Sequence, residues 1–158
     1  MQYAFDLDGT LIDSREAVYR SYIDAGVTPP KDFFGKPFSE WFEGTADEAN
    51  VVRAKKAAAY ASRVDSITCL PLMSLFKILG RQLTDQVTLV TGASAESVRL
   101  LASRFAFPLN VAYVTGCTMG DKVDALLRTS EEGIMFEDDR AVAAYLRKHT
   151  RWTICCTC

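Results

Sequence analysis

Five short runs of apolar and β-branched residues recur along the chain, and stretches with helical periodicity separate most of them. These runs cover residues 2–7, 87–90, 111–114, 133–136 and 152–156. Most are almost continuously apolar, which is typical of strands that are buried on both faces of a parallel sheet. Because strands and helices alternate, we predict an α/β fold with a Rossmann-like, doubly wound parallel sheet of about five strands.

One interval, residues 14–86, breaks this alternation, because it is almost wholly helical in pattern and too long for a simple crossover between strands. Within it, Thr45 and Glu48 have the spacing of a capping box, which marks the start of a helix. A helical pattern at residues 72–79 is expected to pack back on the sheet. We therefore predict an α/β core from residues 1–13 and 87–158, and a mainly helical cap from residues 14–86 that includes this return helix.

Length and composition favour a soluble protein with one core. The chain has 158 residues, of which 49% are hydrophobic and 24% are charged. The net charge of -2 and the pI near 5.4 give no electrostatic reason to expect nucleic acid or an anionic membrane as a partner. No apolar stretch approaches the roughly 20 residues that span a bilayer, and no secretory signal is visible, so we expect a cytoplasmic protein.

Two carboxylates, Asp6 and Asp8, stand at the end of the first apolar run, just before a turn at Gly9 and Thr10. Open α/β sheets bind their ligands at the carboxyl ends of the strands, so a site is expected here. Two carboxylates so close repel each other unless a cation or a shared proton lies between them. Mg²⁺ fits, because it prefers hard oxygen ligands and accepts phosphate oxygens and water. A carboxylate can also attack phosphorus while a second one transfers the proton.

Four short motifs, in order along the chain, resemble those of the haloacid dehalogenase (HAD) superfamily of phosphotransferases. The Asp-x-Asp-Gly-Thr motif of this family is matched by residues 6–10. Thr91, which closes an apolar strand, resembles the second motif, and Lys122, near a helix start, resembles the third. The fourth motif, acidic residues after another apolar strand, is similar to Glu137, Asp138 and Asp139. The helical insertion is placed as in the helical-cap (C1-type) branch of the family, although it is shorter.

This resemblance implies a Mg²⁺-dependent phosphatase that hydrolyses a small phosphate monoester through an aspartyl-phosphate intermediate on Asp6. The family's roles make Asp8 the general acid and base. Thr91 and the amide of Gly92 would bind a phosphoryl oxygen. Lys122 would neutralise charge on the nucleophile and on the phosphate, which matters most in the transition state.

The resemblance also implies a metal site. Asp6, the backbone carbonyl of Asp8, and Asp138 would hold the Mg²⁺ ion. Glu137 or Asp139 would act on the metal through water, or one of them would take the place of Asp138 as a ligand. The sequence leaves open whether Asp139 contacts the metal or instead caps the helix that begins near residue 140.

Three other functions stay open on the same motifs. A phosphomutase uses all four and differs only by holding the released sugar phosphate for a second transfer. A nucleic-acid 3'-end phosphatase is an alternative because the run of residues 138–140 resembles that of polynucleotide phosphatases, although the acidic pI argues against it. A catalytically silent binding or regulatory domain usually lacks the nucleophile or the acid, and here both are present.

Three further groups of residues have a structural explanation that we favour over a functional one. The aromatic residues of the insertion either line a substrate pocket or pack the cap on itself, and these are Phe33, Phe34, Phe38, Trp41 and Phe42. A row of basic residues is expected to be solvated, namely Arg53, Lys55, Lys56 and Arg63. Five cysteines, an odd number, do not suggest a disulfide framework, and we expect small thiols in a buried final strand at Cys155, Cys156 and Cys158.

Overall fold

The computed structural model describes residues 1–36 and 38–157, and the chain forms two compact units. The core unit comprises Met1–Asp13 and Cys69–Cys158, and the helical unit comprises Ser14–Thr68. A two-stranded sheet of β2 (Ile12–Asp13) and β3 (Thr68–Cys69) marks where the chain leaves the core unit and returns to it. Within the described residues, no helix is both long and apolar enough to cross a bilayer.

A five-stranded sheet forms the centre of the core unit, with the strand order β5-β4-β1-β6-β7. Every neighbouring pair of strands is parallel. The strands are β1 (Tyr3–Phe5), β4 (Val87–Val90), β5 (Ala112–Val114), β6 (Ile134–Glu137) and β7 (Thr153–Cys156). Each of the five predicted runs overlaps one of these strands, and the predicted doubly wound α/β fold is confirmed.

The register of the sheet sorts its side chains onto two faces. Ala4 lies opposite Met135, and Phe5 lies opposite Leu89 and Phe136. Because successive side chains in a strand point to opposite faces, these two sets belong to different faces of the sheet. Ala4 and Met135 belong to a buried cluster with residues of two helices, α6 (Met119–Thr129) and α7 (Arg140–His149). Phe5 lies on the other face.

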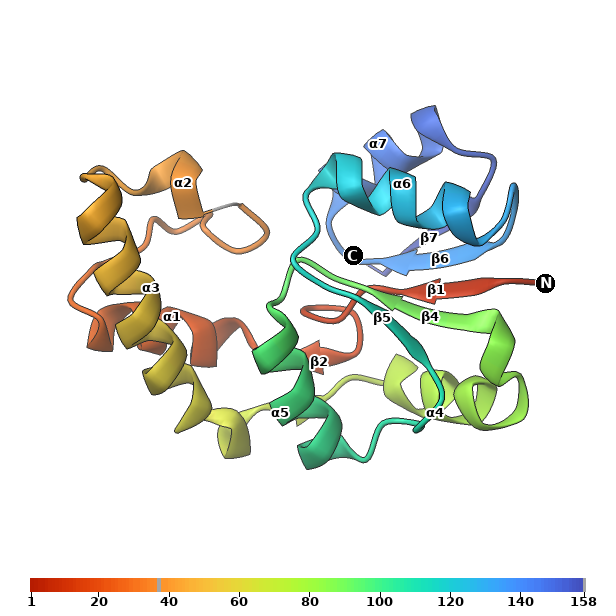
Figure 1. Ribbon diagram of the computed structural model, residues 1–158, viewed down its shortest axis with the longest axis horizontal. Helices are drawn as coiled ribbons and strands as arrows, with labels where there is room; N and C mark the ends of the chain where they lie inside the picture. Colours follow the sequence, from red (N-terminus) through yellow and green to blue (C-terminus); the bar gives the residue numbers. More distant parts are fainter. Residues whose placement is uncertain (37, 158) are drawn as a thin grey trace. The chain divides into compact units, whose positions relative to one another are not determined.

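Helices α6 and α7 cover one face of the sheet, and α4 (Leu72–Gln82) and α5 (Ala95–Phe105) cover the other (Figure 1). A short 3₁₀ helix (Thr84–Gln86) joins α4 to β4. Phe76 of α4 is fully buried, and its ring makes edge contacts with the rings of Phe5 and Phe107 at centroid distances of 5.3 Å each. The return helix is therefore part of the core unit, which resumes at Cys69 and not at residue 87.

The helical unit contains α1 (Arg15–Asp24), α2 (Phe38–Trp41), α3 (Ala46–Ala61) and a 3₁₀ helix (Val64–Ser66). Thr45 and Glu48 form the predicted capping box at the start of α3, where Glu48 Oε2 accepts from Thr45 N at 2.7 Å. Helix α1 packs along α3, and Arg63 donates to the carboxylate of Asp24 at the end of α1. The aromatic residues of this unit pack mainly on one another, which is the interpretation that the sequence favoured.

The final strand is only partly buried. Ile154 is buried, whereas Cys155 and Cys156 are half-buried. Cys155 is a free thiol, as are Cys69 and Cys117. Cys156 is disulfide-bonded, so the expectation of free thiols along this strand is wrong at that position.

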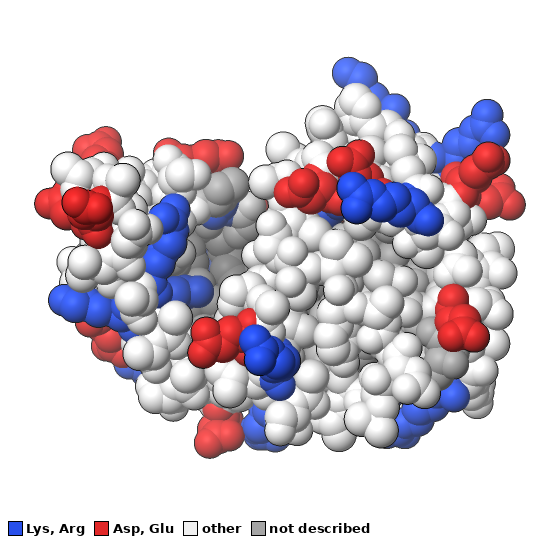
Figure 2. Space-filling view, viewed as in Figure 1, with Lys and Arg blue, Asp and Glu red and all other residues white. Residues whose placement is uncertain are grey.

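Charged side chains on the face of the molecule drawn in Figure 2 are of both signs. Acidic and basic groups are interspersed there, and basic groups do not gather into one continuous patch.

Candidate active site

The predicted site residues of the core unit follow the carboxyl ends of its central strands. Asp6 directly follows β1, and its backbone N donates to Phe136 O at 3.0 Å. Thr91 directly follows β4, and its N donates to Val114 O at 2.9 Å. Glu137 ends β6, and Asp138 comes next. Because all these strands are parallel, the four residues meet at one edge of the sheet.

The alternation of side chains explains which of them lie close together. Asp6 is two residues beyond Ala4, and Glu137 is two residues beyond Met135, so both carboxylates point to the face that α6 covers. Lys122 lies in α6 and reaches both of them. Its Nζ is 2.8 Å from Asp6 Oδ1 and 2.7 Å from Glu137 Oε2. All three side chains are buried, with 8% or less of each exposed.

The start of α6 fixes the position of Lys122. Thr118 is the N-cap, and its side chain accepts from Asp121 N, while the Asp121 carboxylate accepts from Thr118 N at 2.9 Å. Lys122 N then donates to Thr118 O at 3.0 Å, which is the first helical turn. A capping box therefore sets the residue from which the lysine side chain extends towards the sheet.

Three acids, Asp6, Glu137 and Asp138, lie close to one another, and Lys122 contacts the first two. One carboxylate oxygen from each lies within 4.8 Å of the others. The hydroxyl of Thr10 donates to Asp138 Oδ1 at 3.2 Å. When all are ionised, three carboxylates face one ammonium group, which leaves two negative charges without compensation. Oxygen ligands with this excess charge, two of them buried and that of Asp138 half-buried, suit a divalent cation such as Mg²⁺.

The pKa values of these groups reflect the crowding. Burial and the charge of Asp6 raise the pKa of Glu137 to about 7, although Lys122 opposes the shift. Burial and the charge of Asp6 also raise the pKa of Asp138 to about 6. Burial raises the pKa of Asp6 itself, again against the pull of Lys122. Burial would lower the pKa of Lys122, but the charges of Asp6 and Glu137 outweigh it and raise that pKa, so the lysine stays an ammonium ion.

Gly9 permits the close approach of Asp138. Its φ is +80°, in the region that favours glycine. A Cβ atom at this position would lie 2.1 Å from Asp138 Oδ2. Asp8 lies half-buried in the same turn and forms a backbone bridge with Ile12. Asp6 and Asp138 belong to the cluster of three acids whose carboxylate oxygens lie within 4.8 Å of one another, and Asp8 is not among those three.

Thr91 and Gly92 form the turn after β4. Thr91 is 1% exposed, and its Oγ1 accepts from Ala93 N at 3.1 Å, which leaves the hydroxyl proton able to donate. Thr91 O accepts from Cys117 N at 3.0 Å, so the turn is tied to the segment that leads into α6. Gly92 is exposed, and a Cβ there would lie 3.3 Å from Cys117 O.

Asp139 caps a helix, which is one of the two roles that the sequence left open for it, and its contact with a metal stays a prediction. Its Oδ1 accepts from Ala141 N at 2.7 Å and from Val142 N at 3.1 Å, at the start of α7. Glu137 Oε1 in turn accepts from Asp139 N at 3.2 Å. Oδ1 of Asp139 therefore caps α7. The carboxylate of Glu137 accepts hydrogen bonds from Lys122 Nζ and from Asp139 N.

Two contacts of the site were not anticipated from the sequence. One is the hydroxyl of Thr10 on Asp138, and the other is the link from Lys122 to Glu137. For Thr10 a signal existed, because a hydroxyl residue directly after the glycine turn is part of the first motif. For the ion pair with Glu137, no local pattern exists, since the two residues come from different elements.

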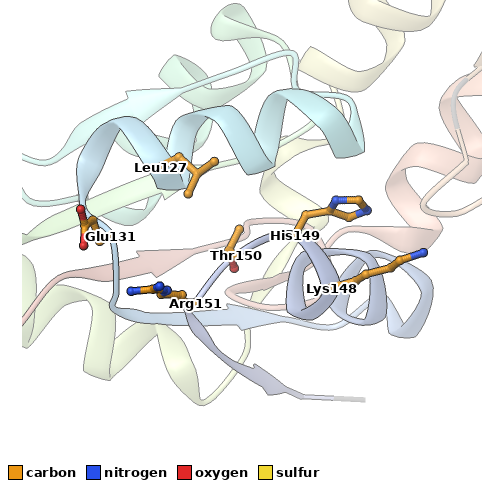
Figure 3. A pocket seen from close by; sticks show the side chains of 6 residues that line it. All are labelled: Leu127, Glu131, Lys148, His149, Thr150 and Arg151. Carbon is orange, nitrogen blue, oxygen red and sulfur yellow. The ribbon is translucent and has the colours of Figure 1, made fainter.

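A cavity of about 440 Å³ lies at the opposite edge of the sheet (Figure 3). Its lining includes Glu131 and Thr150, which precede β6 and β7, whereas the acids of the site follow β1 and β6. Lys148 and Arg151 also line it but point in opposite directions. Basic residues in the last turn of α7 stabilise the carbonyls at that helix end. This cavity stands apart from the acidic cluster.

Comparison with known proteins identifies the fold. No protein-family profile matches the sequence, and no curated protein sequence matches it significantly. Solved structures do match over almost the whole chain. A hydrolase from Pseudomonas syringae has 18% sequence identity and a TM-score of 0.78, with 97% of this chain and 82% of the hydrolase covered. The architecture is therefore one that known hydrolases share, although their sequences have diverged widely.

Two further structures extend this likeness. CbbY from Rhodobacter sphaeroides, solved with phosphate and with xylulose-1,5-bisphosphate, has 13% identity and a TM-score of 0.75, covering 99% of this chain and 86% of CbbY. A haloacid dehalogenase-like family hydrolase from Streptococcus pneumoniae has 16% identity and a TM-score of 0.68, covering 94% of this chain and 80% of that protein.

Proposed function

We propose that this chain, which has the fold of the haloacid dehalogenase superfamily, is a Mg²⁺-dependent phosphatase that hydrolyses a small phosphate monoester. The observation that carries the proposal is the buried contact of Lys122 with Asp6, beside Asp138, at the carboxyl edge of the sheet. A buried ion pair is seldom a gain in stability, so its presence at a ligand-binding edge supports a chemical role.

Asp6 is the nucleophile in this proposal. Its carboxylate attacks phosphorus, the bond from phosphorus to the alcohol oxygen breaks, and an aspartyl-phosphate forms. Lys122 supports this step because its ammonium favours the ionised carboxylate and attracts the phosphate. Asp8 protonates the departing alcohol, and then, as a carboxylate, removes a proton from the water that hydrolyses the intermediate. Attack of that water returns Asp6 and releases inorganic phosphate.

The phosphoryl group is assigned to Thr91, Gly92 and Lys122. The Thr91 hydroxyl can donate to a phosphoryl oxygen, and the Gly92 amide lies in the same turn. Both would act as fixed donors that need little reorganisation as charge develops. The ammonium of Lys122 already lies beside Asp6 and so beside the phosphorus atom that Asp6 would attack.

The acidic cluster is assigned to Mg²⁺. The proposed ligands are Asp6, Asp138 and the backbone carbonyl of Asp8. Glu137 would act indirectly, since its carboxylate accepts a hydrogen bond from Lys122 Nζ. Bound there, the ion would offset the excess negative charge of the site and polarise the phosphoryl group. Thr10 would orient Asp138 through the hydrogen bond that it already donates.

The helical unit is proposed to be the cap of the enzyme, placed as in the helical-cap branch of the superfamily. A cap that closes over the site would exclude bulk water and admit a small phosphorylated molecule. Phosphate and a sugar bisphosphate bound to CbbY support a substrate of this class. The cytoplasmic location expected from the sequence stays a prediction.

A phosphate-release assay on a broad panel of phosphate esters tests this function. We expect Mg²⁺-dependent turnover that EDTA removes and that Asp6→Asn reduces by about 10³-fold or more. Asp124→Asn, at an exposed acid on the same helix as Lys122, is the matched control and should keep full activity. Absence of turnover on every ester would favour the silent binding domain. Conversion of a sugar phosphate to its isomer would favour the phosphomutase. A preference for oligonucleotide ends would favour the nucleic-acid phosphatase.

A further inference from the structure

A cavity in the helical unit lies among aromatic side chains and belongs to that unit alone. Its volume is about 420 Å³, within the range of small-molecule sites. The described residues that line it are Val27, Thr28, Pro30, Trp41, Phe42 and Glu43. Most of this lining is apolar or aromatic, and its single charged group is the carboxylate of Glu43. The cavity therefore combines aromatic rings with one negative charge.

The two rings of this cavity are held in place by neighbouring rings. Phe42 stacks on Phe38 with centroids 4.6 Å apart, and Trp41 packs at nearly a right angle against Phe38 and against Tyr22, at 5.0 Å each. Gly44 lets the Phe42 ring lie against the backbone, because a Cβ there would be only 2.6 Å from the ring. Trp41 and Phe42 are thus positioned before any ligand arrives, which reduces the entropy lost on binding.

Several aromatic rings of the helical unit already have an Arg or Lys side chain of the same unit over their faces. Arg53 lies over Phe38 at 5.2 Å, Lys56 lies over Tyr22 at 5.4 Å, and Arg15 lies over Phe34 at 5.9 Å. Among the described residues, no such cation lies over Trp41 or Phe42. These two rings line the cavity beside Glu43, so they are the aromatic partners left for a cation from outside.

We propose that this cavity is a binding site for a small organic ammonium group with an apolar body. Trp41 and Phe42 contact the alkyl groups and attract the positive charge through their π faces, and Glu43 supplies the opposite charge at the rim. An anionic ligand would meet the carboxylate without any basic group in the described lining to offset it. The site is independent of the phosphate chemistry at Asp6, and either proposal can fail without the other.

Choline and its neutral isostere 3,3-dimethylbutan-1-ol test the proposal, because they have nearly the same shape and differ in charge. Binding of each to the full chain is measured by titration calorimetry and by the change in tryptophan fluorescence. Trp152 is buried in the core unit, so a change in emission reports on Trp41. We expect choline to bind about tenfold more tightly than the alcohol, which corresponds to the cation–π and charge contributions together.

Variants separate charge from shape. Glu43→Gln should weaken choline about tenfold and leave the alcohol unchanged, and Gly44→Ala should weaken both by pushing the Phe42 ring aside. Glu40→Gln, at an exposed acid of α2 outside the lining, is the matched control and should bind choline as the wild type does. Equal affinity for both probes, no binding of choline, or an equal loss in the Glu40 and Glu43 variants would each overturn the proposal. Melting temperatures confirm that each variant is folded.

Discussion

Glu137 should give the metal-free protein a characteristic dependence of stability on pH. Burial and the charge of Asp6 raise the pKa of its carboxyl from 4.5 to about 7 on folding. A carboxyl with a raised pKa binds its proton more tightly in the folded chain than in the unfolded chain. Its contribution to stability is fully present below the unfolded pKa and is lost as the pH rises through the folded pKa. The contribution of Glu137 to the free energy of unfolding is therefore lost between about pH 4.5 and about pH 7.

The size of this effect follows from the shift. One pKa unit corresponds to about 1.4 kcal/mol, so the side chain of Glu137, which is 1% exposed, contributes about 3 kcal/mol across this pH range. For a chain of this length, about 1 kcal/mol moves the melting temperature by roughly 2–4 °C. The metal-free wild type should therefore melt roughly 6–12 °C lower at pH 8 than at pH 5. The raised pKa of Asp138 acts in the same direction.

Glu137→Gln is the informative variant, because it keeps the shape of the protonated side chain and has no proton to release. In EDTA it should lose less stability than the wild type between pH 5 and pH 8, as measured by thermal and urea unfolding. Glu131→Gln, at an exposed acid of the same unit, should follow the wild type at both pH values. Mg²⁺ should stabilise the wild type more at pH 8 than at pH 5, since the metal binds deprotonated ligands. A wild type that gains stability from pH 5 to pH 8, or equal slopes for wild type and Glu137→Gln, would refute this reasoning.

Three substitutions test other parts of the structure. Thr10→Val removes the donor to Asp138 and should weaken Mg²⁺ binding about 10- to 100-fold in titration calorimetry, so unchanged affinity would argue against the orienting role. Gly9→Ala places a methyl group against the Asp138 carboxylate and should abolish phosphatase turnover, and full activity would contradict the assigned position of Asp138. Phe76→Ala should lower the free energy of unfolding by about 3–5 kcal/mol in urea, whereas Leu75→Ala, on the exposed side of α4, should change it by less than about 1 kcal/mol; similar losses would disprove the packing.

The sequence predicted the sheet well because each strand carries its own signal. The run before Asp6 is apolar, ends in a turn, and lies in the middle of the sheet, where burial on both faces requires such a run. Asp6 at its end could be placed at the carboxyl edge without knowledge of any other strand. The other residues of the site could be predicted only because the four motifs follow one another along the chain in the order of the family.

Other features depend on contacts between distant segments and have no local signal. The pairing of Lys122 with Glu137 needs the first turn of α6 to lie over β6, which no spacing in the sequence reveals. The capping role of Asp139 depends on where α7 begins, and that helix starts at the next residue, whereas a metal role of Asp139 stays a prediction. The second segment of the core unit begins at Cys69 and includes α4, because Phe76 of that helix packs on Phe5 of β1.

The central position of β1 has a consequence for synthesis of the protein on the ribosome. β1 pairs with β4 at Val87–Val90 and with β6 at Ile134–Glu137, so the first strand to be made must wait for both of its neighbours. Until then Phe5 and Leu7, which are fully buried in the folded chain, have no sheet to cover them. Pairing over such long separations is slow and exposes apolar surface. Phe5 and Leu7 therefore stay uncovered until both partner strands, β4 and β6, have been made.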